Sequence, residues 1–347
     1  MMLPVSDAHH SRLGVVAIGR NEGPRLERCL ASVKTVQHRV YVDSGSADNS
    51  VALARNAGVT VVELPVPPHF TAARARNAGL TRLLKDSPQL EFVQVIDGDC
   101  ELQPGWLEIA LAMLRDDPSL AVVFGRLRER FPQKSIYNAL CDDEWDLPVG
   151  EASGMLGIAL CRVEALREVD FYDSSIIAGE DSELALRLRK AGWRLKRVAV
   201  EMALHDAAIY RFRQWWGRTR RSGHCFAELA SRYPGCRDPD WSRSVRSIML
   251  WGGALPFTLL LCFLLAACLD WRWLLGDLLL LAAYVMQAWK IARRQVRRGL
   301  DPRVARASGA LLTLGKVPQL LGVLSYCRNR LLGRHSRLIE YKGAETA

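Results

Sequence analysis

The feature that most constrains this chain is an uncharged apolar run late in the sequence, "IMLWGGALPFTLLLCFLLAACL", from Ile248 to Leu269. A helix needs about 20 apolar residues to cross the hydrocarbon core of a bilayer, and this run supplies them without a charged side chain. Helices buried in soluble domains rarely contain so long an uncharged stretch. The run therefore predicts a membrane-spanning helix.

A second apolar stretch follows after a short turn and predicts a return crossing. "WLLGDLLLLAAYVMQAW" runs from Trp273 to Trp289, with a tryptophan at each end, as in the aromatic belts of membrane proteins. Asp277 lies near one end, where a carboxylate costs much less free energy than at the bilayer centre. Basic residues follow within residues 290–299, and such clusters favour the cytoplasmic side. Residues 236–290 are thus predicted to hold a transmembrane hairpin with both ends in the cytoplasm, in the inner membrane of a cell.

The third apolar stretch, from Ser308 to Cys327, leaves two structures open. Lys316 and Pro318 lie in its middle and basic residues follow it. An amphipathic or re-entrant segment at the membrane surface is therefore favoured over a third spanning helix. With either structure, residues 291–347 are predicted to form a basic tail at the cytoplasmic face.

Charge and cysteine content restrict the partners and the compartment. The formal net charge of +10 at pH 7 favours an anionic partner, such as nucleic acid, a phosphorylated ligand or an acidic membrane surface. The nine cysteines include no CxxC pair, which fits reduced thiols better than disulfides or a zinc site. The first residues lack the long apolar core of a signal peptide. We therefore expect residues 1–235 to form a cytoplasmic domain.

This first part of the chain alternates between short apolar runs and helical patterns. The apolar runs are typical of strands covered on both faces, and they are residues 13–19, 39–44, 59–64, 92–97 and 121–126. Between them lie segments with helical spacing, several with Ser, Thr or Pro near the start. The alternation predicts an α/β fold with a mostly parallel central sheet flanked by helices. Ligands of such sheets bind at the carboxyl ends of the strands.

Polar side chains gather at these predicted strand ends. They are Asn21 and Glu22 after the first run, Asp43 at the end of the second, and Asp97 and Asp99 at the end of the fourth. An aspartate after a strand often only begins a turn, but three at one edge of a sheet favour a ligand site. Asp97 and Asp99 are separated only by Gly98, and two carboxylates so close repel each other unless a cation lies near them. Mg²⁺ or Mn²⁺, held by carboxylates and by the phosphates of a substrate, would explain this pattern.

The order of the motifs resembles family 2 of the nucleotide-sugar-dependent glycosyltransferases, which have the GT-A fold. The motifs are "RNE", "VDSGSAD", "RNAG" and "DGDC", each after an expected strand or at the start of an expected helix. A single Asp-x-Asp occurs by chance in many chains, whereas this ordered set is specific. The first motif departs from the family's common Pro-Thr-Tyr-Asn-Glu form, since Gly19 and Arg20 replace its middle residues. The identity of the nucleotide therefore stays open.

The resemblance implies roles for these residues. It implies a nucleotide-sugar-binding group formed by Asn21, Glu22, Asp43, Arg76 and Asp97, with Asp43 near the base and Asp97 at the nucleoside. It also implies that Asp99 holds Mg²⁺ or Mn²⁺ on the diphosphate of the donor.

A second pair of acids, Glu180 and Asp181, precedes a helical pattern. Acidic residues commonly begin helices, where they favour the positive end of the helix dipole. In family 2, however, an acidic pair at this distance after the metal motif supplies the catalytic base. The resemblance thus implies that Asp181 takes the proton from the acceptor hydroxyl while Glu180 helps to orient the acceptor. One base acting with a metal-bound leaving group implies a single displacement with inversion.

A basic segment, "MALHDAAIYRFRQWWGRTRRSGH", lies between the acidic pair and the first apolar run. It fits a juxtamembrane helix that binds anionic lipid. Arg218 and Arg221 are nevertheless candidates to bind the donor diphosphate, and His205 is a candidate metal ligand. Gln214 and Trp215 resemble part of the Gln-x-x-Arg-Trp motif of processive synthases, but the arginine is one position late. The mismatch favours addition of single sugars.

Together these features predict a membrane-bound, metal-dependent, inverting glycosyltransferase that acts in envelope or exopolysaccharide biosynthesis. Its predicted donor is a nucleoside diphosphate sugar, and its predicted acceptor is a polyprenyl-linked or other membrane-proximal glycan. Two alternatives stay open: a nucleotidyltransferase on a similar scaffold, and a non-catalytic membrane-bound binding protein. Nucleic-acid binding is disfavoured because the basic residues adjoin the apolar segments and no recognition motif is present. A dinucleotide oxidoreductase is disfavoured because no GxGxxG follows the first strand.

Overall fold

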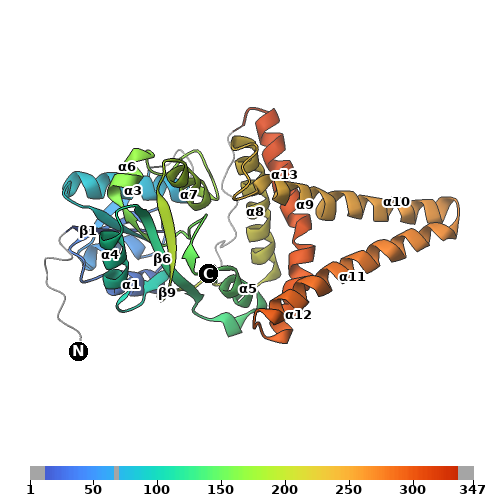
Figure 1. Cartoon of the computed structure of the whole chain (residues 1–347), viewed down its shortest axis with the longest axis horizontal. Helices are drawn as coiled ribbons and strands as arrows, with labels where there is room; N and C mark the ends of the chain where they lie inside the picture. Colours follow the sequence, from blue (N-terminus) through green and yellow to red (C-terminus); the bar gives the residue numbers. More distant parts are fainter. Residues whose placement is uncertain (1–11, 66–69, 335–347) are drawn as a thin grey trace. The chain divides into compact units, whose positions relative to one another are not determined.

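The computed structural model describes residues 12–65 and 70–334, which fall into two compact units (Figure 1). The first unit combines the chain up to Phe131 with Glu144–Ala207. The second combines Pro132–Asp143 with the chain from Ala208 onward. The predicted catalytic acids and the strand-end residues all belong to the first unit.

The first unit is built on one mixed β-sheet. Its spatial order is β3-β2-β1-β4-β8-β6-β9-β5, and β7 pairs with β9. The strands are β1 (Leu13–Gly19), β2 (His38–Asp43), β3 (Thr60–Glu63), β4 (Phe92–Asp97), β5 (Cys100–Leu102), β6 (Leu120–Glu129), β7 (Gly150–Glu151), β8 (Ala159–Arg162) and β9 (Arg194–His205). All five strands expected from the apolar runs are present, with ends that differ by a few residues. The α/β class is therefore confirmed.

The prediction of a mostly parallel sheet is wrong. β1 pairs in parallel with β2 and β4, β2 with β3, and β6 with β9. β8 runs antiparallel between β4 and β6, while β5 and β7 run antiparallel to β9. The strands β1 to β4 follow one another through helices, as parallel pairing requires, whereas several of the later strands follow one another without such a crossover. β5 follows β4 after a turn of two residues, and β7, β8 and β9 were not among the predicted strands.

Helices cover the sheet and begin in the expected gaps between strands. In the first unit they are α1 (Pro24–Ser32), α2 (Ser50–Asn56), α3 (Ala72–Asp86), α4 (Trp106–Asp116), α6 (Val163–Glu168) and α7 (Glu180–Lys190). Thr71 caps α3 by accepting a hydrogen bond from the Arg74 amide at 3.2 Å. A Cβ at Gly79 would lie 2.4 Å from Val16 Cγ1, so this glycine allows α3 to pack closely on β1. This packing fixes the start of α3, which carries Arg76.

The second unit is helical. Its elements are α5 (Ile136–Glu144), α8 (Phe212–Arg232), α9 (Trp241–Ile248), the π-helical turn η3 (Met249–Ala254), α10 (Leu255–Cys268), α11 (Leu274–Arg297), α12 (Pro302–Leu314) and α13 (Lys316–Leu331). α13 packs along α8 at glycine positions. A Cβ at Gly223 would lie 2.0 Å from the Gln319 carbonyl oxygen, and one at Gly322 would lie 2.1 Å from that of Arg220. Glycine at these points lets the two backbones touch.

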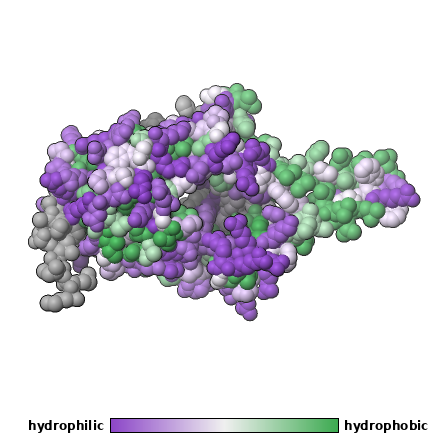
Figure 2. All heavy atoms as spheres, in the orientation of Figure 1, coloured by the Kyte–Doolittle hydropathy of each residue, from purple (hydrophilic) through white to green (hydrophobic). Residues whose placement is uncertain are grey.

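By length and composition, three helical stretches of the described chain could cross a membrane: Trp241–Cys268, Trp271–Arg297 and Pro302–Leu331. Hydrophobic side chains cover the paired helices α10 and α11, and hydrophilic residues lie at their tip (Figure 2). In the third stretch 39% of the apolar window is buried against protein, compared with 0% in the second. The third stretch therefore contacts protein over more of its surface. Whether it crosses the membrane or lies at its surface stays a prediction.

His224 is a buried titratable group on α8. Its side chain is 1% exposed, and its ring meets that of Tyr326 edge-on, with 5.4 Å between centroids. Burial, together with the nearby charges of Arg220 and Arg221, lowers the pKa of His224 to about 4. Glu228 Oε2 lies 3.6 Å from Nδ1, but its attraction does not outweigh the burial.

This pKa makes the stability of the protein depend on pH. Below about pH 6.5 the unfolded chain binds a proton at His224, whereas the folded state stays neutral until about pH 4. Stability is therefore complete above pH 6.5 and falls as the pH decreases toward 4. We expect His224→Gln to remove up to about 3 kcal/mol of this acid-dependent loss, measured by urea unfolding at a series of pH values. Identical pH slopes for the two proteins would contradict the assignment.

Candidate active site

The turn after β4 lies at the centre of the candidate site. The Gly98 amide donates to the Ile18 carbonyl oxygen at 2.7 Å, and a Cβ on Gly98 would lie 3.2 Å from that oxygen. Glycine therefore lets this turn lie directly against the end of β1. Asp97 and Asp99 flank Gly98, and the turn leads directly into β5.

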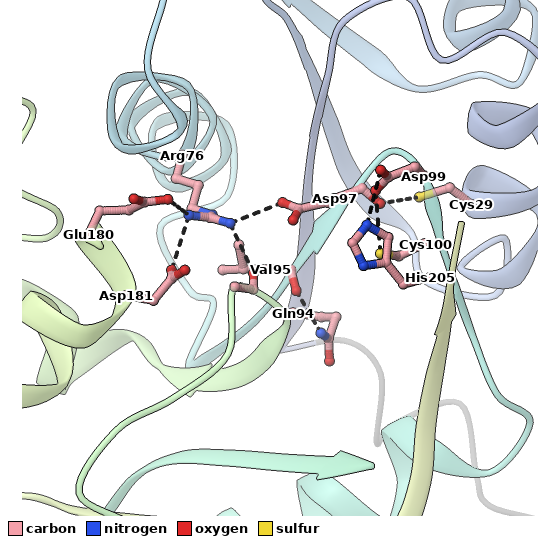
Figure 3. A network of polar contacts seen from close by, with 11 residues as sticks. Cys29, Arg76, Gln94, Val95, Asp97, Asp99, Cys100, Glu180, Asp181 and His205 are labelled. Carbon is pink, nitrogen blue, oxygen red and sulfur yellow. Dashed lines mark hydrogen bonds and ion pairs between the residues drawn. The ribbon is translucent and has the colours of Figure 1, made fainter. Parts of the chain in front are cut away.

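Arg76 joins three acids from distant parts of the sequence (Figure 3). Its side chain is 2% exposed. Nη2 donates to Asp97 Oδ1 at 3.0 Å, while Nη1 donates to Glu180 Oε1 at 2.7 Å and to Asp181 Oδ1 at 3.0 Å. Nη2 also donates to the Gly157 carbonyl oxygen at 3.2 Å. Both predicted catalytic acids thus share one cation with the first aspartate of the "DGDC" motif.

The electrostatics of this group follow from its burial. Burial alone would lower the pKa of Arg76, but the charges of Asp181 and Asp97 raise it well above its usual value, so the guanidinium stays charged. Burial raises the pKa of Asp97, Arg76 opposes that shift, and repulsion from Asp99 adds to it. Asp97 and Asp99 therefore repel each other as the sequence suggests.

The acidic pair is held in position by the first turn of α7. Gly179 precedes α7 with a left-handed φ of 84°, a conformation that favours glycine, and Glu180 and Asp181 begin the helix. The preceding loop is fixed to α3, because Asn77 Nδ2 donates to the Tyr172 carbonyl oxygen at 2.7 Å and the Tyr172 amide donates to Asn77 Oδ1 at 3.0 Å. One helix, α3, thus orients both Arg76 and the loop that leads to the acids.

Space for a ligand next to the acids depends on Gly157. A Cβ at this position would lie 3.2 Å from Asp181 Oδ2 and 3.5 Å from Asp97 Oδ2. It would also lie 2.6 Å from Arg76 Nη2. A larger residue would therefore fill the space between the two carboxylates.

A second group of polar atoms lies on the other side of Asp97 (Figure 3). His205 Nε2 lies 3.1 Å from Asp99 Oδ2, and Cys100 Sγ lies 3.5 Å from Asp99 Oδ1. The donor atoms of Asp99, Cys100 and His205 all lie within 4.8 Å of one another. An oxygen, a nitrogen and a sulfur atom so close together fit a divalent metal ion.

Strand pairing and an aromatic contact fix His205. β5 and β9 are antiparallel, with Cys100 directly opposite His205. The Asp206 amide donates to the Asp99 carbonyl oxygen at 3.0 Å, which extends this pairing. Trp145 lies over the imidazole ring with 4.5 Å between centroids. The histidine therefore keeps its orientation toward Asp99.

The residues predicted near the nucleotide base form a compact loop structure. Asp43 is 2% exposed and accepts hydrogen bonds from the Gly45 and Ser46 amides at 2.9 and 2.7 Å. Asn21 has a φ of 56°, and its Oδ1 accepts from the Ala47 amide at 2.7 Å. These contacts order the ends of β1 and β2. Contact with a nucleotide stays a prediction for both residues.

Three further predicted residues lie near the ends of elements or in the second unit. Glu22 Oε2 forms an ion pair with Arg25 Nη2 at 2.9 Å, at the start of α1. Arg218 and Arg221 lie on α8 of the second unit, and their proposed contact with the diphosphate stays a prediction. Gln214 accepts from the Arg211 amide at 3.0 Å and caps α8, a structural role that agrees with the imperfect synthase motif.

Sequence reasoning missed several residues of the site. Gly157, Tyr172 and Trp145 lie in irregular segments between helices and strands, where no periodic pattern identifies them. Cys100 is the last residue of the "DGDC" motif, yet its position opposite His205 depends on the register between β5 and β9. Its position beside Asp99, the predicted metal ligand, was the one available signal.

Comparison with known proteins agrees with the geometry. Residues 15–151 match the model of glycosyl transferase family 2. A pre-mycofactocin glycosyltransferase of Mycobacterium tuberculosis H37Rv is 28% identical over 267 residues, which cover 73% of this chain but only 53% of that protein. This chain thus spans about half the length of that relative. An N-acetylglucosaminyl-diphospho-decaprenol L-rhamnosyltransferase of the same strain is 28% identical over 236 residues, 56% of this chain and 76% of that protein.

A solved structure shares the fold. It is a mannosyltransferase from Pyrobaculum calidifontis in complex with GDP-Man and Mn²⁺, with a TM-score of 0.57 and 17% identity. The match covers 90% of this chain and 87% of that one. At this identity the likeness concerns the fold alone.

Proposed function

We propose that the chain, whose residues 15–151 match the model of glycosyl transferase family 2, is an inverting, metal-dependent glycosyltransferase of the inner membrane. Its donor is a nucleoside diphosphate sugar, and its acceptor is a polyprenyl-linked or membrane-proximal glycan. The biological role is envelope or exopolysaccharide assembly. The observation that carries the proposal is the shared contact of Arg76 with Asp97, Glu180 and Asp181.

In the proposed reaction Asp181 is the base. Its side chain is 21% exposed, so an acceptor hydroxyl can reach the carboxylate, and Oδ2 faces the space beside Gly157. Asp181 removes the hydroxyl proton as the oxygen attacks the anomeric carbon, and the nucleoside diphosphate leaves. Glu180, which is only 8% exposed, orients the first turn of α7 through Arg76.

Asp99 and His205 are the proposed metal ligands. Mg²⁺ or Mn²⁺ bound there would neutralise negative charge on the diphosphate leaving group. Asn21, Glu22, Asp43 and Asp97 are proposed to contact the nucleotide sugar, and Arg218 and Arg221 its diphosphate. The family resemblance placed Arg76 among the nucleotide-sugar-binding residues. Its burial and its contacts instead support a role in holding Asp97, Glu180 and Asp181 in position.

The acceptor class rests on the apolar helices. Three stretches are long and apolar enough to cross a membrane, and basic side chains follow the second of them. Such an anchor, with the catalytic unit on the cytoplasmic side, would hold the site beside lipid headgroups. The name of the decaprenol-linked relative agrees with this acceptor class.

Donor and acceptor can be tested in turn. The full chain, purified in detergent, is first screened by thermal shift against a panel of nucleoside diphosphate sugars with and without Mn²⁺. We expect one donor to raise the melting temperature only when metal is present. Labelled donor is then offered with polyprenyl-diphosphate-linked and soluble acceptors in lipid vesicles. Equal transfer to soluble acceptors without lipid would contradict the acceptor class, and binding of nucleoside triphosphates alone would favour a nucleotidyltransferase.

A further inference from the structure

We propose that Cys100 is a third protein ligand of the metal and that the site therefore prefers the later transition-metal ions, such as Co²⁺ and Zn²⁺, to Mg²⁺. The three residues Asp99, Cys100 and His205 are called the Asp99 cluster below. The proposal deepens the proposed function, since it rests on a metal at Asp99, and it assigns to this site a sulfur ligand that Asp-x-Asp chemistry alone does not require.

The geometry of the Asp99 cluster allows one ion to contact all three residues. Metal–ligand distances of about 2.0–2.3 Å place neighbouring ligand atoms roughly 3–4 Å apart. The Nε2–Oδ2 distance of 3.1 Å and the Sγ–Oδ1 distance of 3.5 Å lie in this range. All three donor atoms lie within 4.8 Å of one another, so small rotations of the side chains suffice.

The backbone fixes the cysteine at this place. Cys100 lies directly opposite His205 in the antiparallel pair of β5 and β9, so both side chains are on the same face of the sheet. Cys100 is 1% exposed, and Trp145 covers the imidazole of His205. The thiol is therefore held beside the ion position by secondary structure on both sides.

The chemistry of these atoms decides which ion is preferred. Mg²⁺ favours oxygen ligands and octahedral geometry, whereas imidazole and thiolate favour transition metals. Asp97 is not part of the Asp99 cluster, and its Oδ1 accepts a hydrogen bond from Arg76. Coordination expels the thiol proton to solvent, and no oxidation is involved. A cluster with one carboxylate, one imidazole and one thiol is thus poorly suited to Mg²⁺.

A simpler role for Cys100 is to donate a hydrogen bond from its thiol to Asp99 and to fill space. The test distinguishes the two roles by spectroscopy of the purified full chain loaded with Co²⁺ in the absence of donor. A thiolate ligand produces a near-ultraviolet sulfur-to-cobalt charge-transfer band. We expect this band in the unsubstituted protein and its loss in Cys100→Ser and in Asp99→Asn.

Cys29→Ser is the matched control. Cys29 is also a buried thiol beside the motif, but its Sγ contacts the Asp97 carbonyl oxygen at 3.6 Å and lies outside the Asp99 cluster. This variant should keep the full band, which excludes general loss of thiol binding. Exposed cysteines such as Cys268 and Cys327 are present in every variant, so their contribution cancels in the difference spectra.

The second readout is the affinity of the protein for each metal ion, measured through the donor binding that the ion supports. We expect Cys100→Ala to weaken the affinity for Co²⁺ by about tenfold while the affinity for Mg²⁺ changes little, so the preference for Co²⁺ over Mg²⁺ falls by the same factor. A full band in Cys100→Ser, or an unchanged Co²⁺ preference in Cys100→Ala, would overturn the proposal and leave Cys100 as a hydrogen-bond donor. Circular dichroism of the metal-free variants identifies misfolding. Absence of the band in the unsubstituted protein would also overturn the proposal. Failure of sugar transfer with the band intact would instead refute the proposed function.

Discussion

Replacing Asp181 by asparagine is expected to lower the rate of sugar transfer by about 10²–10⁴-fold, because a positioned general base contributes this much to catalysis. Asparagine keeps the size of the side chain and can still contact Arg76, but it cannot accept the acceptor's proton. In the proposed mechanism, donor and metal bind at other residues, at the strand ends. Their affinities, measured by thermal shift and isothermal titration, should therefore be unchanged.

Glu164→Gln provides the matched control for this substitution. Glu164 lies in the first turn of α6, as Asp181 does in α7, and it is exposed. The control removes one helix-start carboxylate without touching the candidate site, so its transfer rate should equal that of the unsubstituted protein. Full activity in Asp181→Asn would remove Asp181 from the mechanism. Equal loss in both variants would indicate a general effect on folding.

The second large effect is expected from Arg76→Gln, which leaves Asp97, Glu180 and Asp181 without their shared cation. Removing one partner of a buried ion pair costs about 3–5 kcal/mol of stability. Asp97 and Asp181 are 34% and 21% exposed, so water screens part of their charge and we expect a loss near the lower end, about 3 kcal/mol. Transfer should also fall, because the acidic pair loses its fixed position.

Two further variants sharpen the test of Arg76. Arg82→Gln breaks an ion pair on the same helix, in which both side chains are more than 40% exposed, and should cost less than about 1 kcal/mol. Arg76→Lys keeps the charge but not the fork of donors that reaches three carboxylates, so it should recover stability more than transfer. Denaturant unfolding and initial rates measure the two effects separately. Equal losses of stability in Arg76→Gln and Arg82→Gln would contradict the stabilising role assigned to the buried Arg76 ion pairs.

Local sequence patterns predicted the parts of the fold that depend on neighbours in the chain. The apolar runs located β1 to β4 and β6. Because ligands of such sheets bind at the carboxyl ends of strands, Asp97 and Asp99 were predicted to lie at that edge of the sheet. The mixed topology was not predictable in this way. β5, β7 and β8 have two to four residues each. β5 and β7 pair with β9, and β8 pairs with β4 and β6, so their pairing depends on strands that are not their neighbours in the chain.

The same limit applies to the candidate site. The motif order and the family resemblance selected Asp99, Glu180, Asp181 and His205, all of which lie in two adjacent groups of polar contacts (Figure 3). The central position of Arg76 depends on how α3 packs against β1 and the loop before α7, which no local pattern encodes. Cys100 required the register of an antiparallel pair that the sequence did not predict. Long-range packing therefore decided the roles that residue type left open.

The most direct test of the account is the configuration of the first product. The full chain in lipid vesicles is incubated with Mn²⁺, the nucleoside diphosphate sugar found in the donor screen and a polyprenyl-linked acceptor, and nuclear magnetic resonance follows the anomeric proton. A single displacement assisted by Asp181 predicts transfer with inversion, so the new linkage should have the anomeric configuration opposite to that of the donor. A product that retains the configuration of the donor, or hydrolysis of the donor without transfer to any acceptor, would contradict the account.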